Sequence, residues 1–446
     1  MNRLIKLMAA TAVAAFAGLS FAGFKPVFTC DHADAIYKVG ENAKITVKLT
    51  DGKGAAVTSG RFRFKLSNFG DKILETKEVF AEKEGSEFAF TGTSAIPGFI
   101  RLDVMSWMKD KKSWKQEGCF GVGFDPFKIR PGAECPADFN DFWKEAKAKF
   151  AREVTAPIKM DKVDEKGGVA LYELEIPTVG GRSLWGYLQE PLDAGKDGKT
   201  YPVIVSVPGA GPSTHMEINQ TEKDRIRLSV NVHYYRPVRG EAKHGKVHEK
   251  IQKDEDNAWA AKYPVKTVRY TQTGIAVSRE DYFYYGVILG INRTVDWLAA
   301  RPGVDRKHFR YSSGSQGGGF GLILCGLNAN FTRAAVFVPA ITDLLGFKVE
   351  GRESGWPRLI EAQLDENKAA AERNAPYFCG VNFARNIRIP IFYEVGAADT
   401  VCPPMAGFSA YNVTPSTDKH ILLGVGQGHG PLANLRKQIN EWLYAD

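Results

Sequence analysis

Long hydrophobic runs are missing from this 446-residue chain after its first 22 residues, and cysteine and histidine are scarce. The six cysteines and eight histidines follow no zinc-binding spacing, and neither a Walker phosphate loop nor an H-E-x-x-H sequence occurs. The 59 Lys and Arg residues are scattered among 51 acidic residues, so there is no long basic run. We therefore expect a mature chain without a membrane span, a nucleic-acid partner, a metal or a cofactor.

The first 22 residues read "MNRLIKLMAATAVAAFAGLSFA", with a basic start, an apolar middle and small residues at Ser20 and Ala22. This pattern predicts a secretory signal peptide over residues 1–22. The apolar part is too short to make a good membrane anchor. We therefore expect an exported protein, either periplasmic or secreted.

Export permits disulfides, so the cysteines need a structural interpretation. Cys30 and Cys119 flank the first predicted domain, and we expect them to pair as its first and last strands. Cys325 lies on an apolar helix and is expected to be a buried free thiol. The sequence leaves open how the others would pair: Cys135, Cys379 and Cys402.

Apolar residues alternate with polar ones in several short runs between residues 23 and 127. The clearest examples are 43–49, 62–66 and 100–104, and turn sequences such as "DGKG" separate the runs. Short alternating strands over about a hundred residues predict an immunoglobulin-like β-sandwich. No chemistry is evident in it, so a structural or docking role is expected.

Residues 128–446 show a different order, in which strands alternate with helices. A helix is predicted from 139 to 150, and "YPVIVSVPG" is a continuous apolar strand, as in a parallel sheet buried on both faces. This alternation predicts a doubly wound α/β domain of the α/β-hydrolase type. The polar stretch 244–273 is expected to be a long loop or insertion.

The run "SSGSQGGGF" places Ser315 between a predicted strand and a predicted helix. This context predicts a nucleophile elbow, a sharp turn that exposes the serine and that needs small neighbours. Ser313 stands where the usual motif has its first glycine, so a mere glycine-rich turn is the alternative. An unassisted hydroxyl is a poor nucleophile, so Ser315 needs a base.

His429, in "GVGQGHGP", follows a late predicted strand and is the candidate base, because His420 sits at the start of that strand. Asp399 follows the preceding strand and is the candidate acid. The order serine, acid, histidine is that of the α/β-hydrolase fold. The alternatives are a loop histidine and a helix-capping aspartate, and Asp343 is a second possible acid.

A tetrahedral oxyanion needs two N–H donors. The N–H of Gln316, directly after the nucleophile, is one candidate. The other should come from the loop after an earlier strand, and in "VSVPGAGPS" the Ala210 N–H is the best placed.

Several of these segments together resemble the acetylxylan esterase and cephalosporin C deacetylase family, carbohydrate esterase family seven. The resemblance runs from about Pro136 to the end, through "PADFNDFW", "DYFYYGVILGINRTVDWLAARPGVD", "GSQGGGF", "VGAADTVCPPMAGFSAYN" and "GHG". It implies Ser315 as nucleophile, His429 as base and Asp399 as acid, with the Gln316 and Ala210 amides as oxyanion hole.

The chain also departs from that family. Residues 208–210 are Pro-Gly-Ala where the family usually has His-Gly-Tyr, so the acyl pocket is expected to differ. The N-terminal domain and the stretch near His244 are additions to the short family form. They could block the family's oligomeric rings, although a homo-oligomer remains possible.

Taken together, the sequence predicts a secreted serine esterase that removes acetyl or other small acyl groups from carbohydrates, with a small-molecule or polysaccharide acetyl ester as partner. The alternatives are a peptidase or other acyl hydrolase on the same fold, and a catalytically impaired binding protein. Tyr234, Tyr235 and Trp259 could form a sugar platform, but packing is the favoured interpretation of each.

Overall fold

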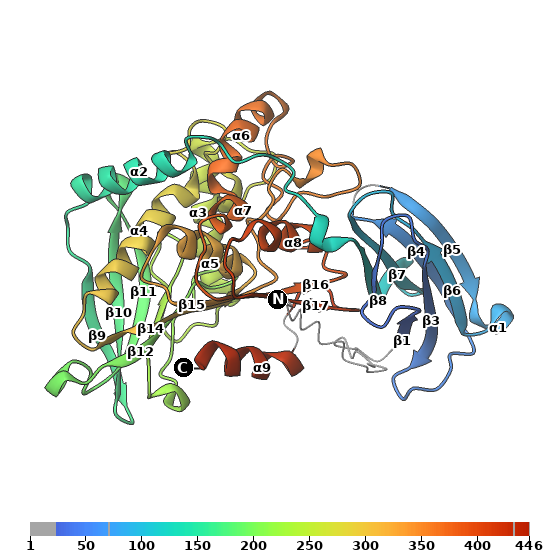
Figure 1. Ribbon diagram of the computed structural model, residues 1–446, viewed down its shortest axis with the longest axis horizontal. Coiled ribbons are helices and arrows are strands. Elements are labelled where there is room, and N and C mark those ends of the chain that lie inside the picture. The colour runs from blue at the N-terminus through green and yellow to red at the C-terminus, as the bar shows by residue number, and fades with distance from the viewer. Residues whose placement is uncertain (1–23, 70–71, 431–432, 446) are drawn as a thin grey trace.

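The computed structural model describes residues 24–69, 72–430 and 433–445. The predicted signal peptide, residues 1–22, lies outside the described residues. A β unit formed by residues 24–124 stands beside a larger α/β unit, as Figure 1 shows. In the described ranges, no helix is long and apolar enough to cross a membrane.

Two sheets make up the N-terminal β unit. The smaller sheet has the order β1-β3-β6, and the larger has the order β2-β8-β7-β4-β5. Its elements are β1 (Phe24–Cys30), β2 (Ile36–Tyr37), β3 (Ala43–Asp51), β4 (Arg61–Asn68), β5 (Ile73–Phe80), α1 (Ala81–Glu84), β6 (Glu87–Gly92), β7 (Gly98–Met108) and β8 (Ser113–Phe124).

The alternation seen in the sequence builds the core of this unit. Ile45 and Val47 of β3 and Phe62 and Phe64 of β4 are buried in one cluster between the two sheets. Because successive side chains of a strand point to opposite faces, alternate residues meet in that cluster. The predicted strands are therefore present, and the immunoglobulin-like assignment stays a prediction.

The predicted disulfide is wrong, because all six cysteines are free thiols. Cys30 lies on β1 in the smaller sheet, where its thiol donates to the His32 carbonyl (2.9 Å). Cys119 lies on β8 in the larger sheet, opposite Asp103 of β7. Burial raises the pKa of the Cys119 thiol to about 11, so it keeps its proton. Cys325 is a buried free thiol, as expected.

A nine-stranded sheet in the order β17-β16-β15-β14-β12-β13-β11-β10-β9 is the centre of the α/β unit. The strands are β9 (Lys159–Lys166), β10 (Val169–Thr178), β11 (Arg182–Pro191), β12 (Tyr201–Ser206), β13 (Ile226–Val230), β14 (Val304–Gly314), β15 (Arg333–Phe337), β16 (Ile391–Gly396) and β17 (Lys419–Gly424). Strands β12 to β17 run parallel, and β9 to β11 form an antiparallel edge. The chain reverses its direction of winding between β12 and β14, where open α/β sheets place their ligands.

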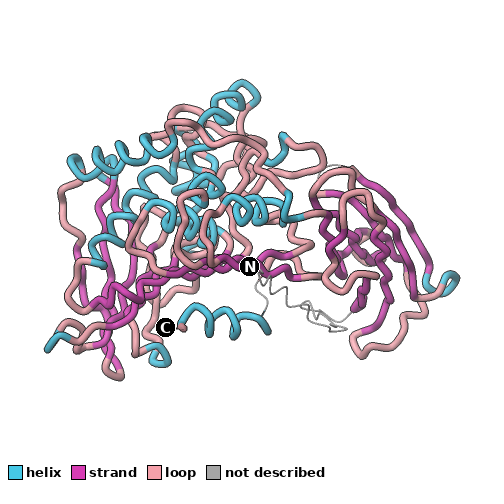
Figure 2. The backbone as a smooth tube through the Cα atoms, in the orientation of Figure 1, coloured by secondary structure: helices cyan, strands magenta, loops and turns pink. Residues whose placement is uncertain are grey.

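Helices cover both faces of this sheet. They are α2 (Phe139–Glu153), α3 (Lys246–Lys262), α4 (Phe283–Ala299), α5 (Gln316–Leu327), α6 (Lys368–Asn374), α7 (Gly380–Ala384), α8 (Pro404–Val413) and α9 (Ala433–Tyr444). Figures 1 and 2 show α9 alone on one side of the parallel strands, with α2, α4, α5 and α8 on the other. Ile439 and Leu443 of α9 join Ile204 and Phe337 of the sheet in a buried cluster.

The sequence predicted a long loop or insertion over 244–273, and the loop alternative is wrong, because α3 occupies residues 246–262. The helix buries only His248 completely, so it lacks the apolar stripe that would have revealed it. An exposed ion pair between Lys250 and Asp254, one helical turn apart, supports it instead.

The two units share a contact surface beside the ends of β16 and β17. Phe99 of β7 packs against Phe408 of α8, with ring centroids 5.5 Å apart. Val425, after β17, packs against the core of the β unit. Gly121 of β8 lies so close to Ala397 that a Cβ on it would stand 2.0 Å from the Ala397 carbonyl oxygen. The β unit therefore touches the loops that follow β16 and β17.

Candidate active site

Ser315 sits on a strained turn between β14 and α5. Its φ of 56° and ψ of −126° are unfavourable for a residue with a Cβ. A Cβ on Gly317 would stand 2.0 Å from the Val207 carbonyl, and one on Gly318 would stand 2.7 Å from the Phe337 carbonyl. The glycines that follow the serine are therefore required by close backbone contacts, which favours the predicted elbow over a loose glycine-rich turn.

Ser313 replaces the first glycine of the usual elbow and has a defined contact. Its hydroxyl donates to the carbonyl of Val207, directly after β12 (2.6 Å). The Ser315 N–H donates to the Phe337 carbonyl of β15 (2.9 Å). Both neighbouring strands thus hold the turn, and the substitution at position 313 leaves its geometry intact.

A chain of hydrogen bonds links the three residues that the sequence predicts as catalytic. His429 Nε2 lies 3.0 Å from Ser315 Oγ, and His429 Nδ1 lies 2.8 Å from Asp399 Oδ2. A neutral imidazole with its proton on Nδ1 donates to the carboxylate and accepts the serine proton. The structure therefore brings Ser315, His429 and Asp399 together in the order needed to activate a hydroxyl.

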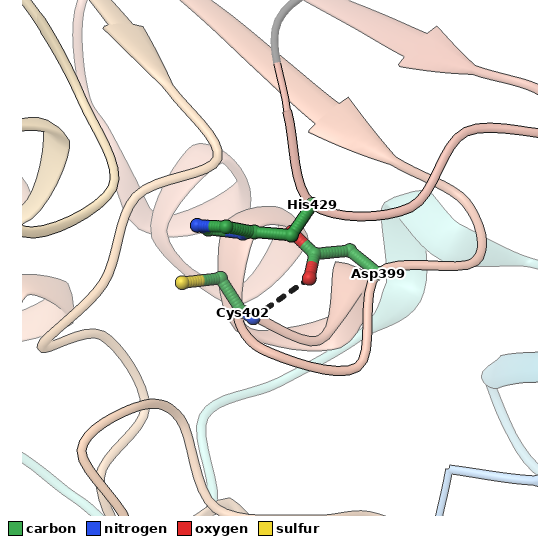
Figure 3. Close-up of side chains that lie close together, drawn as sticks. All are labelled: Asp399, Cys402 and His429. Atoms are coloured by element: carbon green, nitrogen blue, oxygen red, sulfur yellow. Dashed lines mark hydrogen bonds and ion pairs between the residues drawn. The ribbon is translucent and has the colours of Figure 1, made fainter. Parts of the chain in front are cut away.

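Asp399 is fully buried and held in place by its own loop. Its Oδ1 accepts the N–H groups of Val401 (2.8 Å) and Cys402 (2.9 Å), and Figure 3 shows the second of these bonds with the carboxyl group beside His429. The Ala398 N–H also donates to the Gln427 carbonyl (2.9 Å), which ties the aspartate loop to the histidine loop. Both loops therefore keep one relative position.

The alternative acid and base lie elsewhere. Asp343 is buried, and its carboxylate accepts the Gly132 N–H (2.8 Å) and the Ser409 hydroxyl (3.1 Å). Burial raises its pKa. His420, at the start of β17, pairs with Asp418 (2.7 Å). Neither residue joins the hydrogen-bonded chain of Ser315.

The two predicted oxyanion donors flank the serine. A Cβ on Gly209 would lie 3.9 Å from the Ser315 Cβ, which places the loop after β12 directly beside the nucleophile. Within the residues that the structure describes, the N–H groups of Ala210 and Gln316 have no hydrogen-bond acceptor. The Gln316 N–H lies at the first turn of α5, where backbone N–H groups lack helical partners.

The Gln316 side chain has a second role, which the sequence did not reveal. Its Oε1 accepts the hydroxyl protons of Tyr270 (2.7 Å) and Tyr284 (2.6 Å), and its Nε2 donates to the Pro208 carbonyl (3.2 Å). These partners lie 32 to 108 residues away in the sequence, so no local sequence pattern predicts the contacts. The buried network fixes the start of the loop that carries Ala210.

The family model for acetyl xylan esterases matches residues 127–445. The chain belongs to this family. It is therefore a carboxylic ester hydrolase, and it is similar to the acetyl esterase Axe7A of Xylanibacter ruminicola, with 28% identity over 412 residues that cover 89% of this chain and 85% of the relative.

Solved structures of the family share the fold of this esterase. An acetyl xylan esterase from Paenibacillus sp. R4 is 21% identical, with a TM-score of 0.57, and the match covers 71% of this chain and 97% of that one. Acetyl xylan esterase 1 from Thermoanaerobacterium sp. JW/SL YS485 is 18% identical, with a TM-score of 0.56 and coverage of 72% and 98%. The common part is a mixed α/β fold of the esterase type.

In the part of this esterase that the structure describes, one cluster of side chains has ligand atoms close enough together to hold a metal ion. It consists of Asp399, Cys402 and His429, whose ligand atoms lie within 4.8 Å of one another. Figure 3 shows the Cys402 thiol beside the imidazole. Burial raises the pKa of that thiol well above its usual value, so it stays protonated and is a poor ligand. Both oxygens of Asp399 also have partners already.

The three aromatic residues considered as a sugar platform make packing contacts in this structure. Tyr234 stacks on Trp259, with ring centroids 5.8 Å apart, and its hydroxyl donates to the Phe283 carbonyl (2.8 Å). The Tyr235 hydroxyl accepts the Ser213 N–H (2.8 Å). All three side chains are half-buried, and these contacts favour packing over a sugar platform.

Proposed function

We propose that this esterase removes acetyl and other small acyl groups from carbohydrate hydroxyls through a Ser315 acyl-enzyme. The observation that carries the proposal is the hydrogen-bonded chain Ser315–His429–Asp399 on a strained elbow. The names of the relatives, an acetyl esterase and two acetyl xylan esterases, support an acetyl group and a xylan-type substrate.

In the proposed mechanism, Ser315 Oγ attacks the ester carbonyl while its proton passes to His429 Nε2. Asp399 stabilises the imidazolium that forms and keeps the ring in one orientation. The N–H groups of Ala210 and Gln316 donate to the oxyanion, and a donor of this kind is worth about 3–4 kcal/mol in the transition state. The carbon–oxygen bond to the sugar then breaks, and the sugar oxygen takes the proton from His429.

Water completes the cycle by the same route. It loses a proton to His429 and attacks the acyl carbon, and a second oxyanion forms at the same two donors. Collapse releases the carboxylic acid, and Ser315 regains its proton from His429. The cycle balances with one water consumed for each ester cleaved. All the catalytic groups that take part belong to the chain.

The proposal extends to the setting of the enzyme. The parallel strands with the elbow at a strand end support an α/β-hydrolase fold for residues 128–446. The strand orders β1-β3-β6 and β2-β8-β7-β4-β5 support an immunoglobulin-like β-sandwich for residues 23–127. The sequence of residues 1–22 supports export to the periplasm or medium.

Ester hydrolysis by the wild type and two serine variants tests the mechanism. We expect Ser315→Ala to lower kcat on p-nitrophenyl acetate by about 10⁴-fold or more, because the nucleophile is lost. Ser312→Ala, a neighbouring serine outside the hydrogen-bonded chain, should stay within a few-fold of the wild type. A folded Ser315→Ala variant with near-normal turnover would refute the assignment.

The length of the acyl chain and the leaving group test the substrate class. The wild type should prefer p-nitrophenyl acetate over the butyrate and octanoate esters, and it should release acetate from acetylated xylan. A preference for octanoate, or no acetate from xylan under conditions where p-nitrophenyl acetate is cleaved, would contradict the substrate but not the triad.

A further inference from the structure

Lys243 binds the peptide group that carries one of the proposed oxyanion donors. Its Nζ donates to the Gly209 carbonyl at 3.2 Å. In a trans peptide unit the carbonyl and the following N–H point in opposite directions. The contact therefore directs the N–H of Ala210 away from Lys243, and residue 209 lies directly against Ser315.

The ammonium group of Lys243 is unusually placed for a lysine. The side chain is partly buried, and in the part of the chain that the structure describes it makes no ion pair. Burial alone lowers its pKa. No carboxylate neutralises this charge, so its hydrogen bond polarises the Gly209 carbonyl, and a polarised peptide group is a stronger N–H donor.

A second side chain holds the same loop two residues further on. His233 Nε2 donates to the Gly211 carbonyl (3.0 Å), while its Nδ1 lies 2.5 Å from Glu255 Oε2 of α3. The second oxygen of Glu255 accepts the Tyr234 N–H (2.8 Å). Side chains from the segment 233–255 therefore donate hydrogen bonds to the carbonyls of both neighbours of Ala210, Gly209 and Gly211. The Gln316 side chain donates to the carbonyl of Pro208 in the same loop.

We propose that Lys243 is a positioning residue for the oxyanion hole: it fixes and polarises the Gly209–Ala210 peptide so that the Ala210 N–H faces the reacting oxygen. This rests on the proposed function, because it assigns Ala210 to the oxyanion of a Ser315 acyl-enzyme. Without the contact, the peptide can rotate and present its carbonyl instead, which repels the oxyanion. Lys243 directly precedes the segment 244–273, whose purpose the sequence left open, and Glu255 of that segment supports the same loop through His233.

The test is a lysine series assayed on p-nitrophenyl acetate in the full chain. Lys243→Met removes the charge and the donor but keeps the length of the side chain. Loss of a direct oxyanion donor costs about 10²–10³-fold in kcat, and Lys243 acts one step removed, so we expect a fall in kcat of about 10–100-fold with KM within about twofold. Lys243→Arg keeps a cationic donor and should recover most of the rate. Lys246→Met, at the exposed start of α3, is the matched control and should resemble the wild type.

A phosphonate probe separates positioning from folding. The rate at which p-nitrophenyl methylphosphonate phosphonylates Ser315 reports stabilisation of an oxyanion-like state, and it should fall in Lys243→Met in parallel with kcat, while the thermal midpoint stays within about 2 °C. An unchanged kcat, a rise in KM alone, or a normal phosphonylation rate would overturn the proposal. Should Lys243→Met unfold, Lys243→Gln decides the question by the same criteria. The Ser315→Ala variant distinguishes a failure of this proposal from a failure of the proposed function, because it would retain activity only if the proposed function is wrong.

Discussion

Gly121→Ala should damage the active site from the neighbouring β unit. A Cβ at this position on β8 would stand 2.0 Å from the Ala397 carbonyl oxygen, whereas an ordinary contact begins at 3.4 Å. The two backbones must therefore separate by about 1.4 Å. Ala397 lies two residues before Asp399, and a misplacement of about 1 Å in a catalytic group can cost about 10²-fold. We expect kcat on p-nitrophenyl acetate to fall by about 10–100-fold.

Gly52→Ala is the matched control, because a Cβ there meets no atom within 4 Å and Gly52 belongs to the same β unit. The assay compares kcat, KM and the thermal midpoint of both variants with those of the wild type. The overpacking should also lower the free energy of unfolding by about 1–3 kcal/mol. If Gly121→Ala keeps full kcat, then the contact between the two units does not position Asp399, and the reasoning is refuted.

Two further changes test the elbow and a half-buried acid. Gly317→Ala places a Cβ 2.0 Å from the Val207 carbonyl, so we expect a loss of about 1–3 kcal/mol in unfolding free energy and a severe loss of turnover; a fully active variant would contradict the elbow. Burial raises the pKa of Asp256 from 3.8 to about 6, so between these values the native state binds more protons than the unfolded state, and stability falls as the pH rises. Asp256→Asn keeps an acceptor for the Tyr270 N–H and should stabilise the protein at pH 8 by about 1–2 kcal/mol but not at pH 3.5, because partial exposure to solvent reduces the effect of burial on this carboxylate. Urea unfolding at both pH values can show this.

The elbow could be predicted from the sequence because its constraints are local. A serine between a strand and a helix needs small residues around it, and the run after Ser315 supplies them. Asp399 and His429 could be predicted because parallel strands end at one edge of the sheet, which brings the loops after them together. The structure places His429 within hydrogen-bonding distance of both Ser315 and Asp399, as that reasoning requires.

The rest depended on contacts between distant parts of the chain. Helix α3 was missed because it buries only His248 completely, so the apolar periodicity that reveals most helices is absent. The disulfide was expected from the positions of Cys30 and Cys119 at the two ends of the β unit. Pairing requires the two thiols to face each other, and the Cys30 thiol instead donates to the His32 carbonyl.

The sequence marked two stretches as additions to the family form, the N-terminal β unit and the stretch near His244. They contact different loops of the site. Gly121 of the β unit touches the loop that leads to Asp399, and Lys243 and Glu255 act on the loop that carries Ala210. The elbow fixes only Ser315 and the Gln316 N–H, because only these lie on the turn itself. Every other proposed catalytic group sits on a loop, and a loop needs outside contacts to hold a geometry that tolerates about 0.5 Å of error. An acyl-transfer site on this sheet therefore requires contacts that hold its loops in place, and here residues outside the parallel strands make these contacts.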